Sequence, residues 1–205
     1  TVHIIMDCSA SMGFGKPVSK FDYAAMLGVG FGYLAMRENE KFQFSTFAEK
    51  LDVFQPRRGM SQLASMMFHL NSIKTQGYSK ILDSVLQHKK LVGSKSLLVL
   101  VSDFLMNLDD IIEALYLLGD HEVKIIQVLD PIEKNLGMQG DFKLIDSESK
   151  QMLRTYISPR LRVKYQQMLD SHIAKIEEVC NKLNFHFYLV TTDTPIFDAF
   201  YRVLE

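Results

Sequence analysis

The sequence is poor in cysteine. Cys8 and Cys180 are the only two cysteines among 205 residues, and they form no CxxC pair. A disulfide framework, a zinc ribbon and a thioredoxin motif therefore have no support. Such sparse cysteine usage fits a reducing, cytoplasmic setting.

The sequence also lacks a long apolar run and an excess of charge of either sign. The most membrane-like segment, Ala24 to Met36, is bounded by Asp22 and Arg37. It is shorter than the roughly 20 apolar residues that a spanning helix needs, so we expect no membrane contact by this domain. The chain starts directly in a strand-like run, which leaves open a membrane anchor in a longer parent protein. The formal net charge of −1 argues against a nucleic-acid partner bound by a bulk basic surface.

What the sequence does contain is an alternation of strand-like and helical patterns. With 47% hydrophobic and 23% charged residues, the composition predicts one globular domain over residues 1–205. Strands are predicted at Val2–Met6, Lys41–Phe47, Leu51–Phe54, Leu97–Val101, Val123–Leu129 and Phe185–Val190. Helices are predicted at Phe21–Met36, Ser61–Leu70, Ile81–Leu91, Leu108–Leu118, Leu161–Leu183 and from Pro195 onward.

This alternation predicts an α/β fold of three layers, a doubly wound and mainly parallel sheet with helices on both faces. We expect a strand order of about 3-2-1-4-5-6, with a ligand site where the order reverses, between strands one and four. The polar stretch at about residues 131–159 interrupts the pattern and is predicted to form an excursion. Within it, Phe142–Ile145 and Gln151–Tyr156 suggest a hairpin.

A group of oxygen-bearing side chains follows the first predicted strand, in the sequence Asp7-Cys8-Ser9-Ala10-Ser11-Met12-Gly13. Asp7, Ser9 and Ser11 offer a carboxylate and two hydroxyls at alternate positions, which suits a hard cation such as Mg²⁺. Asp103 ends the fourth strand, beside the first, so it is expected to join them. Turn formation or helix capping is the simpler reading of each residue alone.

Four further segments extend this pattern along the chain: Ser11-Met12-Gly13-Phe14-Gly15, Pro56-Arg57-Arg58-Gly59, Val101-Ser102-Asp103-Phe104 and Gln127-Val128-Leu129-Asp130-Pro131. Together they resemble the prokaryotic family called domain of unknown function 58, a branch of the von Willebrand factor A superfamily. The resemblance implies a von Willebrand A (Rossmann-like) fold with a metal-ion-dependent adhesion site. It also implies a parent protein that is often membrane-anchored and a functional link to MoxR-class AAA ATPases.

In adhesion sites of this kind, the serines and a loop threonine hold the ion directly, and the two aspartates act wholly or partly through water. A carboxylate of a partner protein completes the shell. Here Ser79, in Gly77-Tyr78-Ser79, stands where the pattern has threonine, and Thr75 is the second candidate. Serine keeps the hydroxyl but lacks the β-branch that stiffens threonine, which predicts weaker metal binding.

The resulting prediction is a non-enzymatic, Mg²⁺-dependent protein-interaction domain, with Mn²⁺ or Ca²⁺ as possible substitutes for Mg²⁺. Its partner is expected to present Asp or Glu, and a MoxR-class AAA ATPase or its client is the candidate. Two alternatives stay open. The first is a haloacid dehalogenase-type phosphotransferase that uses Asp7, although Ser9 stands where the second aspartate of such an enzyme belongs. The second is a metal-free scaffold.

Three packing expectations accompany this prediction. Gly28, Gly30 and Gly32 suggest close packing of the first helix on the sheet, and the Cys8 side chain is expected to point into the core. Core positions are also expected for Met60, Met66, Met67 and Phe68.

Overall fold

The computed structural model describes residues 1–119, 121–136, 140–145 and 152–205. A six-stranded sheet runs in the order β3-β2-β1-β4-β5-β8. Its strands are β1 (Val2–Asp7), β2 (Phe42–Phe47), β3 (Leu51–Val53), β4 (Leu97–Ser102), β5 (Glu122–Leu129) and β8 (His186–Thr191). All neighbours pair in parallel except β3, which is antiparallel to β2. The predicted fold class and strand order are thus confirmed.

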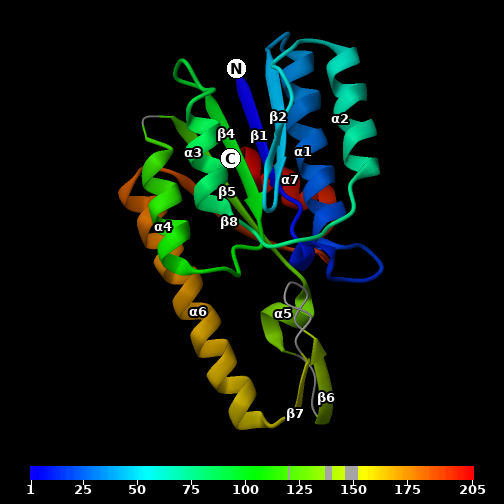
Figure 1. Cartoon of the computed structure of the whole chain (residues 1–205), viewed down its shortest axis with the longest axis vertical. Helices are drawn as coiled ribbons and strands as arrows, with labels where there is room; N and C mark the ends of the chain where they lie inside the picture. Colours follow the sequence, from blue (N-terminus) through cyan, green and yellow to red (C-terminus); the bar gives the residue numbers. More distant parts are fainter. Residues whose placement is uncertain (120, 137–139, 146–151) are drawn as a thin grey trace.

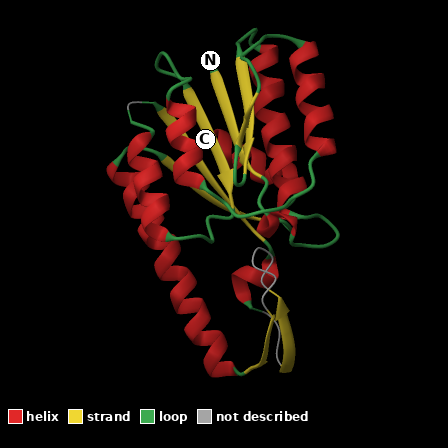
Figure 2. Ribbon diagram, viewed as in Figure 1, coloured by secondary structure: helices red, strands yellow, loops and turns green. Residues whose placement is uncertain are grey.

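Helices cover both faces of this sheet, as Figures 1 and 2 show. Three pack on one face: α1 (Lys20–Arg37), α2 (Met60–Ser72) and α7 (Ile196–Leu204). Three pack on the other: α3 (Ile81–Lys89), α4 (Leu108–Leu117) and α6 (Pro159–Lys182). Because successive side chains of a strand point to opposite faces, each strand supplies both cores. On β1, for example, Ile4 and Met6 belong to the α1 side and Ile5 to the α3 side.

The excursion forms an extension that projects from the body of the domain (Figure 1). We call it the arm, and it consists of α5 (Pro131–Asn135), the hairpin of β6 (Gly140–Ile145) and β7 (Met152–Ile157), and the first turns of α6. The predicted hairpin is therefore present, although Gln151 at its edge lies outside the described residues. Helix α5 was not predicted, because five residues are too few to show a periodicity.

Some packing predictions were wrong. Met66 is buried, but Met60, Met67 and Phe68 are exposed, since α2 lies at the rim of the sheet and buries only one side. A Cβ built on Gly28 would lie 2.7 Å from Met6 Sδ of β1, which confirms close helix-to-sheet packing there. Gly30 instead faces Phe200 of α7.

Candidate metal centre

The predicted metal turn lies at the carboxyl edge of the sheet, where the strand order reverses. Asp7 ends β1, and Asp103 follows the last residue of the adjacent β4. After Asp7 the chain enters a short 3₁₀ helix, Ala10–Gly13. The Ala10 N–H donates to Gly77 O at 3.0 Å, and the Gln76 N–H donates to Cys8 O at 3.1 Å. These bonds fix the turn against the segment that leads to Ser79.

Asp7 is the centre of the cluster and is fully buried. Its Oδ1 accepts the Ser9 N–H at 2.8 Å. Its Oδ2 accepts the hydroxyls of Ser79 at 2.8 Å and Ser102 at 2.7 Å. Burial, together with the nearby charge of Asp103, raises the pKa of Asp7 to about 6. A cation bound beside Asp7 would stabilise its ionised form, which burial otherwise disfavours.

One of the three predicted hydroxyls reaches this carboxylate, and the other two pair with each other. Ser9 Oγ and Ser11 Oγ are 3.2 Å apart, and Ser79 contacts Asp7 directly. Thr75, the second candidate for the loop hydroxyl, instead places its Oγ1 where a Cβ on Gly13 would lie. The placement therefore favours Ser79 over Thr75 as the third hydroxyl.

Asp103 is buried like Asp7 but is held by different groups. Its Oδ1 accepts the Leu105 N–H at 3.1 Å, and its Oδ2 lies 2.7 Å from Lys20 Nζ. Lys20 is itself fully buried, and its ammonium also lies 2.7 Å from Glu133 Oε1. Burial alone would lower the pKa of Lys20, but the charges of Asp103 and Glu133 outweigh it and raise that pKa.

Sequence reasoning missed Lys20, Glu133 and Ser102. Ser102 was visible as the residue before Asp103, and its hydroxyl could have been assigned to the site. Lys20 and Glu133 are 113 residues apart, so no local pattern connects them. A lysine at the first position of a mainly apolar helix is a weak signal.

The donor set decides which ion would fit. Within the described residues, no group of three or more His, Cys, Asp or Glu side chains could hold a metal ion. An ion here would depend on the hydroxyls of Ser9, Ser11 and Ser79 together with Asp7. These oxygen donors fit a hard cation such as Mg²⁺ and disfavour a thiophilic metal. Asp103, already engaged by Lys20, is suited to an outer role through water.

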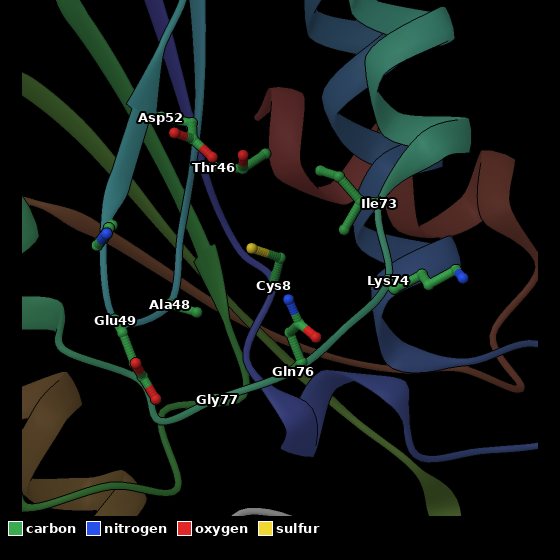
Figure 3. Close-up of a pocket in the computed structure, with 10 residues that line it drawn as sticks. Cys8, Thr46, Ala48, Glu49, Asp52, Ile73, Lys74, Gln76 and Gly77 are labelled. Carbon is green, nitrogen blue, oxygen red and sulfur yellow. The ribbon is translucent and has the colours of Figure 1, made fainter.

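A cavity of about 550 Å³ lies beside the metal turn. Figure 3 shows the Cys8 sulfur pointing into it, between Thr46 of β2 and Gln76, while the Lys74 ammonium points away. Cys8 is partly buried and also packs against the core on the α1 side, so the expectation that it points into the core is confirmed in part. Burial, with the charges of Asp7 and Asp52, raises the pKa of Cys8 to about 12, so its thiol stays protonated at neutral pH. This argues against a nucleophilic role.

A comparison of the sequence with models of known families identifies the family of this chain. The profile described as "Protein of unknown function DUF58" matches residues 1–175. The chain belongs to the DUF58 family. No curated protein matches this DUF58 domain significantly. Within the described residues, no helix is both long and apolar enough to cross a membrane.

Solved structures with a similar fold have low sequence identity to this DUF58 domain. An aerotolerance-related membrane protein from Bacteroides fragilis has 17% identity and a TM-score of 0.61, with 99% of this chain and 96% of that one covered. The conserved hypothetical protein BatB from Bacteroides thetaiotaomicron has 15% identity and a TM-score of 0.56, with 99% and 95% covered. The SpRpn10 VWA domain has 12% identity and a TM-score of 0.54, with 98% and 92% covered. These matches establish a von Willebrand A-like fold.

Proposed function

We propose that this DUF58 domain binds a partner protein through a Mg²⁺ ion held at Asp7, Ser9, Ser11 and Ser79, with Asp103 in an outer role. The observation that carries the proposal is the convergence of Ser79, Ser9 and Ser102 on the buried Asp7 at the carboxyl edge of the sheet. Structural capping alone would not require a hydroxyl from a segment 72 residues away.

The chemistry of this cluster supports binding rather than turnover. With one directly placed carboxylate and several neutral hydroxyls, a bound Mg²⁺ keeps much of its positive charge and attracts a carboxylate of another protein. We therefore infer a partner that presents Asp or Glu, with a MoxR-class AAA ATPase or its client as the candidate. The adjacent cavity leaves room for residues next to that carboxylate.

The first test is the thermal midpoint of unfolding in EDTA, Mg²⁺, Mn²⁺ and Ca²⁺. An ion that binds only the folded chain raises the midpoint according to its concentration relative to its dissociation constant. We expect a rise with Mg²⁺ that shrinks in Ser11→Ala and Ser79→Ala. Ser65→Ala on the exposed face of α2 is the matched control and should keep the full rise. Equal rises in all variants, or none in the unaltered protein, would rule out this site.

The partner is tested with a peptide array in which each Asp- or Glu-containing peptide is paired with its Asn or Gln counterpart. We expect binding to the acidic member only, in Mg²⁺ and not in EDTA. Binding that is insensitive to EDTA would favour the metal-free scaffold, an alternative supported by the Lys20–Asp103 ion pair, which already neutralises one carboxylate. The phosphotransferase alternative predicts Mg²⁺-dependent phosphate release from phosphoesters, and a panel of phosphoesters from which no phosphate is released would exclude it.

A further inference from the structure

Lys20 occupies an unusual position for a lysine. Its side chain has no exposed surface, and its ammonium lies 2.7 Å from both Asp103 Oδ2 and Glu133 Oε1. Its backbone is fixed because Ser19 caps α1 in a capping box and the Lys20 N–H donates to Phe14 O. A rigid element therefore holds one cation between two carboxylates, and a buried charge of this kind is stable only while it is paired.

The two carboxylates belong to different parts of the molecule. Asp103 is part of the candidate metal centre, whereas Glu133 lies in α5 at the base of the arm. Glu133 Oε2 accepts the Asp130 N–H at 3.1 Å, and its backbone carbonyl accepts the Tyr165 hydroxyl of α6 at 2.7 Å. The Glu133 side chain thus connects Lys20 to the first turn of α5, and the same residue connects α5 to α6.

We propose that Lys20 couples cation binding at the metal centre to the arm. This inference rests on the proposed function, because it requires an ion beside Asp7. A divalent ion there attracts Asp103 and repels the Lys20 ammonium, so both effects weaken the Lys20–Asp103 pair. Lys20 then keeps Glu133 as its main counter-ion, and the contacts that Glu133 makes at the base of the arm tighten. The stability of α5 at the base of the arm thereby depends on whether an ion is bound at the metal centre.

Amide hydrogen exchange in Mg²⁺ and in EDTA tests this coupling. The informative amides are Asp130, bonded to the Glu133 carboxylate, and Lys134 and Leu136, bonded within α5. We expect Mg²⁺ to slow their exchange by roughly fivefold, the low end of the usual coupling between two sites. In Glu133→Gln, Lys20 keeps Asp103 as an ionic partner and the fold is retained. The Mg²⁺-induced rise in thermal midpoint should persist there, but the change in exchange should disappear.

Tyr165→Phe is the matched control, because it removes the contact between α5 and α6 and leaves the Lys20–Glu133 pair intact. In EDTA the α5 amides of this variant should exchange faster than those of the unaltered protein. Mg²⁺ should still slow their exchange. Two outcomes overturn the coupling and leave the proposed function standing: a midpoint rise without slower exchange at α5, or equal slowing in Glu133→Gln. A protein whose midpoint does not respond to Mg²⁺ at all overturns both.

Discussion

At the scale of single residues, two buried histidines give this domain a defined sensitivity to acid. The rings of His3 on β1 and His88 on α3 lie edge to face, with centroids 5.1 Å apart. Neither ring nitrogen of His88 has a hydrogen-bond partner among the residues that the structure describes. Burial lowers the pKa of each histidine from 6.5 to about 4, because neither can be charged without losing its hydration.

The sign of the pH effect follows from these values. Between pH 6.5 and 4 the unfolded chain binds protons at these positions and the folded chain does not, so the free energy of unfolding falls as the pH falls. At pH 5 the loss is about 2 kcal/mol for each histidine. We predict that His88→Leu, close to His88 in size, lessens the fall in urea midpoint between pH 7 and pH 5. His186→Leu, at an exposed position, is the control and should keep the full fall. If the urea midpoint of His88→Leu fell between pH 7 and pH 5 as much as that of the unaltered protein, His88 would not be a source of the acid sensitivity.

Ser79 allows a gain-of-function prediction. Its hydroxyl already reaches Asp7 Oδ2 at 2.8 Å, but serine rotates more freely about χ1 than threonine. We predict that Ser79→Thr increases the Mg²⁺-induced rise in thermal midpoint, corresponding to a dissociation constant lower by a few fold. The control substitution Ser65→Thr, at an exposed position on α2, should not alter the response of the thermal midpoint to Mg²⁺. A weaker response in Ser79→Thr would mean that the added methyl group clashes with the turn.

At the scale of elements, the packing of α7 on α1 depends on one missing side chain. A Cβ on Gly30 would lie 2.5 Å from Phe200 Cε2, and Phe200 also stacks edge to face on Phe31. Alanine favours helix over glycine by about 1 kcal/mol, yet the added Cβ would force the Phe200 ring off its packing on Phe31, and displacements of this kind typically cost about 1–3 kcal/mol. We therefore predict that Gly30→Ala lowers the free energy of unfolding in urea.

The matched test of this clash is a double-mutant cycle. Phe200→Leu alone removes packing and destabilises the domain, but in the Gly30→Ala background it also relieves the overlap. The two losses should therefore combine to less than their sum. Additive losses would show that Gly30 and Phe200 do not interact.

Periodicity predicted most of the elements, and its failures have physical causes. The continuous apolar runs of β4 and β5 and the long amphipathic pattern of α6 were sufficient to locate those elements. Helix α5 was missed because it is held by the capping box of Asp130 and Glu133 and not by an apolar face. The turn after β4 was also not predicted, because it places buried Phe104 at a φ of 50°, a conformation that a phenylalanine does not indicate.

The candidate site also contains residues that the sequence indicates and residues that it does not. The common location of Asp7, Ser9, Ser11 and Asp103 could be predicted because strand ends of a doubly wound sheet meet at a known edge, and their binding of an ion stays a prediction. Lys20 and Glu133 could not, because an ion pair across 113 residues depends on how the finished helices sit on the sheet.

At the scale of the whole molecule, the hairpin of the arm is separate from the main sheet. Strands β6 and β7 pair with each other in a sheet of their own, and Gly140 pairs with Ile157 at its base. We predict that replacing residues 141–156 by a short glycine linker leaves a domain that unfolds in one transition, with equal calorimetric and van't Hoff enthalpies. Two transitions, or loss of the fold, would show that the single-domain prediction for residues 1–205 needs revision.

The buried position of Lys20 also constrains how this domain is made. On the ribosome, α1 is complete long before residue 103 has been synthesised, and residue 133 follows later still. Placing Lys20 in its buried position before then would leave its ammonium without a counter-ion, at a penalty of several kcal/mol. Lys20 can therefore take up its buried position only once β4 has left the exit tunnel and supplies Asp103, and its second carboxylate follows with α5.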